Sequence, residues 1–158
     1  MKPAINPDEV ARHAAQLFLQ GYNCGQAVLV AFARHYDLTP EMASRMSAAF
    51  GGGMGLQRMT CGSVLAMAVL AGLEWGNETP ADRPAMQRSF RAIQTLTARF
   101  IEQYGSATCG EIMGFKGFQK ADGPAHHQPV PEAYRTRPCT MKVALCARLF
   151  AQLLTEDF

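Results

Sequence analysis

Apolar residues recur along this chain at the three- to four-residue spacing of amphipathic helices, and short capping signals separate the runs. In the first run, Asn6-Pro7 is a helix-start signal, apolar residues then fall on one face, and Gly21 ends the helix. The longest run begins after Asp82 as N-cap and ends at Gly105. The same signals predict helices over about residues 7–20, 24–36, 40–50, 61–73, 84–104, 106–114 and 139–153.

No segment alternates polar and apolar residues with the two-residue period of a half-buried strand. The predicted fold class is therefore all-α, a single-domain bundle of about six or seven helices over residues 1–158. Two segments interrupt the helices. One is the Gly-rich loop Gly51-Gly52-Gly53-Met54-Gly55, and the other is a long irregular loop between Gly114 and Pro138.

Two finer expectations concern packing. Thr60 is predicted to be the N-cap of the 61–73 helix, which is expected to be buried on every side because nearly all its residues are small or apolar. Trp75 and four methionines are interpreted as helix-packing residues. These methionines are Met42, Met46, Met59 and Met67.

Composition excludes several classes of protein. Of 158 residues, 48% are hydrophobic and 18% charged, which excludes intrinsic disorder and a coiled coil. The net charge of +2 gives no electrostatic footprint for nucleic acid. No apolar stretch reaches the roughly 20 residues that span a bilayer, and the first residues do not resemble a signal peptide. No membrane insertion and a cytoplasmic location are therefore predicted.

The chain has five cysteines, and an odd number in a reducing compartment argues against a disulfide scaffold. No pair has the C-x-x-C spacing of a thioredoxin-like site or a zinc ribbon. Four cysteines nevertheless share a setting close to a predicted helix start: Cys24, Cys61, Cys109 and Cys139. Cys146 lies two turns inside the last helix and is interpreted as a packing residue.

A helix start favours thiolate chemistry, because its unpaired amides and the positive end of its dipole stabilise negative charge. The pKa of the four cysteines is therefore expected to lie below the free value of about 8.5. Thiolates bind metals and attack disulfides. From the residues alone, an equally good interpretation is that the cysteines are small buried hydrophobes.

The Gly-rich loop also has two interpretations. Amides at Gly52 and Gly53 could form an anion-binding nest or let the backbone approach a cofactor closely, or the loop could simply connect two packed helices. A nucleotide-binding P-loop is excluded, because no lysine follows the glycines and no strand precedes them. The cofactor interpretation is favoured by the short distance along the chain to Cys61.

Taken together, these blocks resemble a known family. The blocks are Gly21-Tyr22-Asn23-Cys24-x-Gln26-Ala27-Val28, Phe50-Gly51-Gly52-Gly53-Met54-Gly55, Cys61-Gly62, Cys109 with Gly114, and Cys139 before a C-terminal helix. They are similar to the C_GCAxxG_C_C family, small helical proteins with four spaced cysteines to which redox activity is ascribed. A related segment occurs in split-Soret cytochromes, where such cysteines are associated with an iron–sulfur cluster. The resemblance covers about residues 8–155 and implies no haem, since the haem-attachment motif is missing.

The resemblance implies that Cys24, Cys61, Cys109 and Cys139 are candidate ligands of an iron–sulfur cluster, used for electron transfer or redox sensing. Gly52 and Gly53 would then line the cofactor. A second hypothesis is thiol–disulfide chemistry without a cofactor, for which Cys24 and Cys61 are the suggested pair. A third is a non-catalytic structural zinc site or an interaction module. The expected partner is a redox protein of unknown identity, and a homodimer is plausible.

Overall fold

The computed structural model describes residues 4–114 and 139–158, and these residues form helices joined by short turns. The elements, including two 3-10 turns, are α1 (Pro7–Leu19), α2 (Cys24–Ala31), η1 (Ala33–Tyr36), α3 (Pro40–Ser47), η2 (Ala48–Phe50), α4 (Gly51–Met54), α5 (Gly62–Trp75), α6 (Arg83–Tyr104), α7 (Cys109–Met113) and α9 (Cys139–Leu153). The described residues contain no strand, and an isolated bridge joins Thr60 to Thr108. The predicted all-α class is confirmed.

Side-chain caps begin several helices where the sequence predicts them. The Asn6 side chain accepts hydrogen bonds from the amides of Asp8 and Glu9 at 2.9 and 3.1 Å. The Asp82 side chain likewise accepts the amide of Ala85 at 3.1 Å at the start of α6. Each such cap contributes about 1 kcal/mol by satisfying an amide that the helix leaves without a partner.

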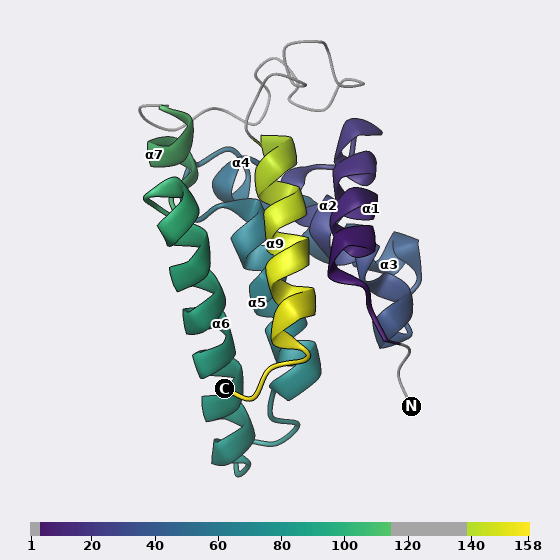
Figure 1. Ribbon diagram of the computed structural model, residues 1–158, viewed down its shortest axis with the longest axis vertical. Helices are drawn as coiled ribbons and strands as arrows, with labels where there is room; N and C mark the ends of the chain where they lie inside the picture. Colours follow the sequence, from purple (N-terminus) through teal and green to yellow (C-terminus); the bar gives the residue numbers. More distant parts are fainter. Residues whose placement is uncertain (1–3, 115–138) are drawn as a thin grey trace.

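The helices pack around α9, which lies between α1 and α6 with α5 behind it (Figure 1). An ion pair joins Arg148 of α9 to Asp8 of α1, with 3.0 Å between Nε and Oδ1. A second joins Arg99 of α6 to Glu156 beyond the end of α9, at 2.6 Å. Both pairs are largely exposed, so burial of the apolar faces contributes most of the packing energy.

The core lies where α2, α5 and α9 meet. Phe150 of α9 is fully buried, packs edge-on against Phe32 at 5.1 Å between ring centroids and tilts against Trp75 at 5.7 Å. Burial of one such side chain stabilises the fold by about 1.5–3 kcal/mol. The interpretation of Trp75 as a packing residue is confirmed.

Several predicted helix limits are wrong in detail. The second and third helices are shorter than predicted, because their last residues form the 3-10 turns η1 and η2. Thr60 is not the cap of α5: Cys61 is the N-cap, and residues 58–61 pair instead with the backbone of residues 107–110. The predicted Gly-rich loop contains the short turn α4, in which Gly52 and Gly53 have left-handed φ values of 67° and 70°.

The burial predictions are also wrong in part. Helix α5 is not buried on every side, since Ala68, Gly72 and Leu73 are exposed. Met67 is fully buried, but the other three methionines interpreted as packing residues are between 43 and 52% exposed, because they lie on outer faces that no other described element covers: Met42, Met46 and Met59. The predicted long irregular loop falls almost entirely on residues 115–138, outside the described part of the chain.

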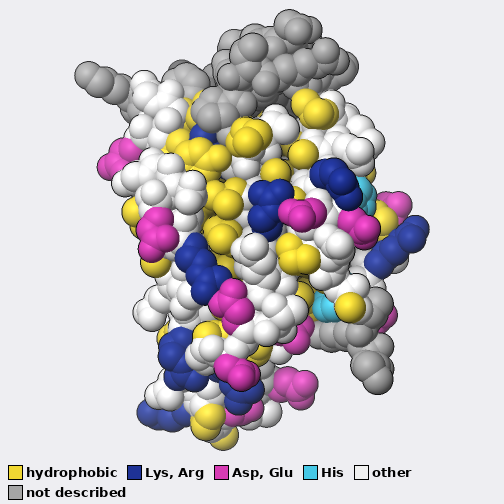
Figure 2. Space-filling model, in the orientation of Figure 1, with side chains coloured by type: hydrophobic (Ala, Val, Ile, Leu, Met, Phe, Trp, Pro, Cys, Tyr) yellow, Lys and Arg dark blue, Asp and Glu magenta, His cyan; other side chains and the backbone are white. Residues whose placement is uncertain are grey.

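One end of the bundle gathers α4, α7 and the first turn of α9 (Figure 1). On the face shown in Figure 2, acidic and basic side chains are interspersed, and hydrophobic side chains line the seam between α6 and α9. Among the described helices, none has both the length and the apolar character needed to cross a bilayer.

Candidate functional site

The first cysteine of the candidate site begins α2, and a capping box fixes its position. The Asn23 side chain accepts the amide of Gln26 at 2.9 Å, and the Gln26 side chain accepts the amide of Asn23 at 3.1 Å. Asn23 Nδ2 also donates to the carbonyl of Ala48 at 2.8 Å, and Gln26 Nε2 donates to Ser44 Oγ at 3.0 Å. The two polar residues that flank Cys24 therefore hold the start of α2 against α3 and η2.

The Gly-rich turn brings backbone amides to Cys24. At Gly52 and Gly53 the chain adopts left-handed φ values, which residues with a Cβ rarely adopt. The amide of Gly52 donates toward the Cys24 sulfur and favours its thiolate. These glycines thus bring the backbone close to Cys24, and their role in lining a cofactor stays a prediction.

The second and third cysteines are joined by backbone pairing between two distant segments. The amide of Cys61 donates to the carbonyl of Ala107 at 2.8 Å, and the amide of Cys109 donates to the carbonyl of Met59 at 2.6 Å. The amide of Gly110 donates to the backbone carbonyl of Arg58 at 3.0 Å. These bonds place the starts of α5 and α7 side by side, although 48 residues separate their cysteines along the chain (109 − 61).

Missing side chains allow the cysteine-bearing segments to approach closely. A Cβ on Gly62 would lie 2.5 Å from Cys24 Sγ, and a Cβ on Gly53 would lie 2.7 Å from Cys109 Cβ. A Cβ on Gly25 would lie 2.6 Å from Phe50 Cβ. All three distances are shorter than any normal contact, so these positions admit only glycine without movement of their neighbours.

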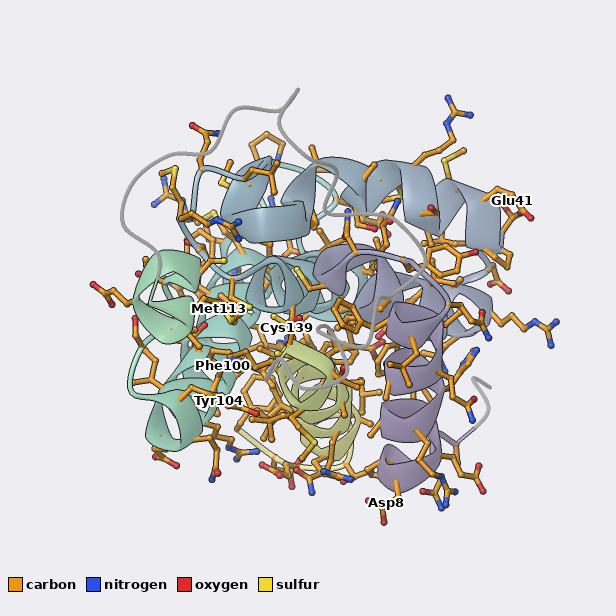
Figure 3. The ribbon with its side chains drawn as sticks, turned by 90° about the horizontal axis from the view of Figure 1, so that it is seen from above. Asp8, Glu41, Phe100, Tyr104, Met113 and Cys139 are labelled. Atoms are coloured by element: carbon orange, nitrogen blue, oxygen red, sulfur yellow. The ribbon has the colours of Figure 1, made fainter. Side chains whose placement is uncertain are left out.

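The fourth cysteine, Cys139, begins α9 and lies beside α7. Its Sγ is 3.6 Å from Met113 Sδ, and Figure 3 shows both residues on the side of the bundle that also carries Tyr104. Negative charge on Cys61, Cys139 or Cys109 would act on the thiol of Cys24, and charge on Cys109 would act on Cys61. The fold therefore brings together the four cysteines predicted from the helix starts, which we call the cysteine site.

The cysteine site holds free thiols. Cys61 and Cys109 are buried, and Cys24 and Cys139 are half-buried. Within residues 4–114 and 139–158, no three His, Cys, Asp or Glu side chains are close enough together to hold a single metal ion. The four sulfurs are near enough to interact electrostatically.

The expected fall in cysteine pKa is wrong for two of the four. Burial raises the pKa of Cys24, charge on its neighbouring cysteines adds to the rise, and the Gly52 amide only partly opposes it. Burial likewise raises the pKa of Cys61, against the amides of Ser63 and Val64. The helix-start amides act in the predicted direction, but loss of hydration outweighs them.

Sequence analysis did not identify four further residues at the site, which are Arg58, Tyr104, Met113 and Lys142. Arg58 is buried with Nη1 3.8 Å from Cys109 Sγ. Lys142 is buried with Nζ 3.9 Å from Met113 Sδ and 4.6 Å from the centroid of the Tyr104 ring. The available signals were weak: Arg58 lies between the Gly-rich turn and Cys61, and Lys142 lies one helical turn after Cys139.

Cys146 occupies a different environment. It is fully buried within the hydrophobic core of α9, as its interpretation as a packing residue requires. Burial raises its pKa, and charge on Cys61 or Cys24 would raise it further. It is thus a neighbour of the cysteine site that packs in the core.

Comparison with known protein families matches residues 22–153 to the family described as "Putative redox-active protein (C_GCAxxG_C_C)". The chain belongs to this family. Comparison with curated proteins and with solved structures gave no match. The matched residues include the whole cysteine site together with Arg58 and Lys142.

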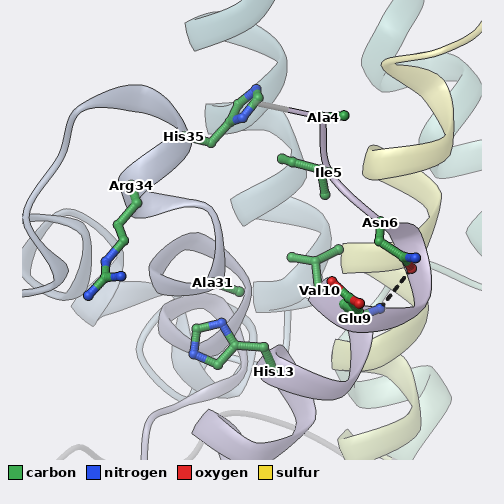
Figure 4. A pocket seen from close by; sticks show the side chains of 9 residues that line it. All are labelled: Ala4, Ile5, Asn6, Glu9, Val10, His13, Ala31, Arg34 and His35. Atoms are coloured by element: carbon green, nitrogen blue, oxygen red, sulfur yellow. Dashed lines mark hydrogen bonds between the residues drawn. The ribbon is translucent and has the colours of Figure 1, made fainter. Parts of the chain in front are cut away.

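Another concave feature lies mostly outside the part of the chain that matches the C_GCAxxG_C_C family. It is a pocket of about 340 Å³ beside the start of α1, with His13 and His35 on its wall (Figure 4). Six of its nine lining residues precede residue 22, and none is a cysteine. The cysteine site, and not this pocket, is therefore the candidate for the family's redox chemistry.

Proposed function

We propose that Cys24, Cys61, Cys109 and Cys139 bind an iron–sulfur cluster, which the protein uses for electron transfer or redox sensing. The observation that supports this proposal is that four thiols from four separate helix starts lie close enough together for negative charge on one to raise the pKa of another. Four thiolates are the usual ligand set of [2Fe–2S] and [4Fe–4S] clusters, which exchange single electrons when bound.

A structural zinc ion held by the same four cysteines is the third candidate. Tetrahedral zinc with bonds of about 2.3 Å would draw four sulfurs to about 3.8 Å from one another. Metal and sulfide analysis of the protein separates the two occupants, because a zinc site contains no acid-labile sulfide.

The surrounding residues suit anionic ligands. The Gly52 amide would donate to Cys24, and the amides of Ser63 and Val64 would favour the thiolate of Cys61. Hydrogen bonds to ligand sulfurs disperse their charge and raise the reduction potential of a bound centre. Gly53 and Gly62 keep side chains out of the space between the cysteines. The protein would thus contribute ligands, oriented donors and a partly buried enclosure.

Thiol–disulfide exchange by Cys24 and Cys61 is the second candidate, and the electrostatics disfavour it. An attacking cysteine needs an appreciable thiolate fraction near neutral pH. Burial raises the pKa of both thiols and keeps them protonated. A bound cation reverses this preference, because it deprotonates the thiols that coordinate it.

We propose the cytoplasm as the location of the protein and a redox protein as its partner.

The proposal is tested by anaerobic reconstitution of the full chain with ferrous iron and sulfide. Absorption between 300 and 700 nm is recorded, and iron, zinc and acid-labile sulfide are measured on the same sample. A brown protein with stoichiometric iron and sulfide is expected. Colourless, metal-free protein after reconstitution would exclude the cluster, and thiol counting with and without reductant would then test the dithiol alternative.

Alanine variants identify the ligands. Replacement of Cys24, Cys61, Cys109 or Cys139 one at a time should lower the bound iron and sulfide strongly while helical circular dichroism persists. Cys146→Ala is the matched control, because it removes a buried thiol from α9 without touching the proposed ligand set. Equal loss in all five variants would point to general destabilisation and contradict the assignment.

A further inference from the structure

Lys142 is a buried cation at the edge of the cysteine site. Its side chain lies on α9, and the residue is only 2% exposed, whereas the adjacent Met141 is 67% exposed. The ammonium faces the Tyr104 ring and the Met113 thioether, at 4.6 Å from the ring centroid and 3.9 Å from the sulfur. Figure 3 shows Tyr104, Met113 and Cys139 gathered on this side of the bundle.

This burial is costly without a counter-charge. Lysine normally keeps its ammonium in water, and a buried ammonium is destabilising unless it is paired. In the described part of the chain no carboxylate pairs with Lys142, and its ring and thioether contacts offset only part of the lost hydration. Burial accordingly lowers the pKa of Lys142, while the surrounding cysteines act in the opposite direction.

The cysteines that act on Lys142 change charge when a metal binds. Cys139, Cys61 and Cys109 are among the groups whose negative charge would stabilise the ammonium. As thiols they are neutral and give it no partner. As metal-bound thiolates they are anionic, and the same contacts then become favourable.

We propose that Lys142 is the counter-charge of the loaded cysteine site, a positioning residue that stabilises the anionic ligands and favours the reduced form of the bound centre. This inference rests on the proposed function. Reduction adds one electron from a one-electron donor, and the cysteine site with its occupant becomes more negative by one charge. A nearby fixed cation therefore stabilises the reduced form more than the oxidised form.

The test uses four full-length variants, one of which, Lys142→Leu, controls for the shape of the side chain. Lys142→Met keeps the length and apolar character of the side chain but removes the charge, and Lys142→Arg keeps the charge. Arg148→Met is the matched control, because it also removes one cation from α9, but at an exposed position. Each protein is measured twice: by urea unfolding without metal under reducing conditions, and by redox titration with dithionite after reconstitution with ferrous iron and sulfide.

Lys142→Met should unfold at a higher urea concentration than the unaltered protein when no metal is bound, since it removes an unpaired buried charge. After reconstitution it should be reduced at a more negative potential, with a reduction equilibrium at least tenfold less favourable, which is 59 mV for one electron. Lys142→Arg should keep the potential close to that of the unaltered protein, and Arg148→Met should change it less than twofold.

Two results would overturn the inference: lower stability of metal-free Lys142→Met, as for an ordinary packing residue, or an unchanged potential in the reconstituted variant. Lys142→Leu, measured in parallel, separates loss of charge from misfit of the methionine side chain. Failure of the proposed function looks different, because the unaltered protein would then take up no iron and sulfide. The metal-free unfolding data would in that case test the premise alone: stabilisation of Lys142→Met would agree with an unpaired buried charge, and destabilisation would show an ordinary packing residue.

Discussion

Replacing Gly62 by alanine tests whether close approach of α2 and α5 forms the cysteine site. The added Cβ would lie 2.5 Å from Cys24 Sγ and 2.6 Å from the carbonyl oxygen of Phe50. Neither atom can move freely, since the Phe50 carbonyl belongs to the backbone of η2 and Cys24 to a capped helix start. Overpacking of this kind costs about 1–3 kcal/mol.

Gly72→Ala is the matched control on the same helix. A Cβ there meets no heavy atom within 4 Å, and the residue is exposed. Alanine in a helix interior is more stable than glycine by about 0.5–1 kcal/mol, so this variant should be stabilised. One substitution at two glycines of α5 is thus expected to change the free energy of unfolding in opposite directions.

Urea unfolding followed by circular dichroism, under anaerobic reducing conditions, measures both effects. Thermal unfolding should agree, with a shift of about 2–4 °C for each kcal/mol in a chain of this size. Gly62→Ala should also take up less iron and sulfide on reconstitution, whereas Gly72→Ala should be unaffected. If Gly62→Ala were as stable as the unaltered protein and bound iron and sulfide equally well, the close approach would have no energetic meaning.

Two further predictions follow from the capping box and from the buried thiols. Asn23→Ala removes the buried N-cap of α2 and the hydrogen bond to the carbonyl of Ala48. It should lower the free energy of unfolding by about 1–2 kcal/mol in urea titrations. A change below about 0.5 kcal/mol would contradict the capping role. The pKa of Cys24, Cys61 and Cys146 is raised in the folded state, so the three neutral thiols add to the free energy of unfolding of the metal-free protein. This contribution should be complete below about pH 8.5, the pKa of an unfolded cysteine. Above that pH the free energy of unfolding should fall, by at most about 1.4 kcal/mol per pH unit for each thiol. The pKa of Lys142 is lowered, so its effect on the free energy of unfolding has the opposite sign, and the fall with pH should be steeper in Lys142→Met. Urea midpoints that stay constant from pH 7.0 to 9.5 would refute the argument.

Local sequence signals predicted the helices well because their causes are local. The caps at Asn6 and Asp82 bond amides two or three residues away, and the glycine that ends α6 has the left-handed φ of 76° that such a position requires. The placement of the cysteines at helix starts follows from the same signals. Thr60 was misassigned because its partner, Thr108, lies in a distant segment.

Burial and pKa could not be predicted in the same way, since both depend on what packs against a helix. Met42 and Met46 are apolar, as residues on a buried helix face usually are, and only the fold shows that no described element covers them. The pKa of Cys24 depends on enclosure by three other segments, which outweighs the amides of its own helix. A lysine inside the protein has no distinct sequence pattern, so Lys142 was missed.

The repeated Cys-Gly pair connects these local and distant effects. Glycine follows the cysteine at Cys24-Gly25, Cys61-Gly62 and Cys109-Gly110. The first two glycines serve the neighbouring helix: Gly62 leaves room for Cys24 Sγ, and a Cβ on Gly25 would lie 3.1 Å from the carbonyl of Gly62. At the third, the amide of Gly110 joins α7 to Arg58. In each pair the cysteine supplies a candidate ligand, and the glycine either admits or bonds a segment that carries another candidate ligand. A two-residue pattern thus marks three of the four distant helix starts that meet at the cysteine site.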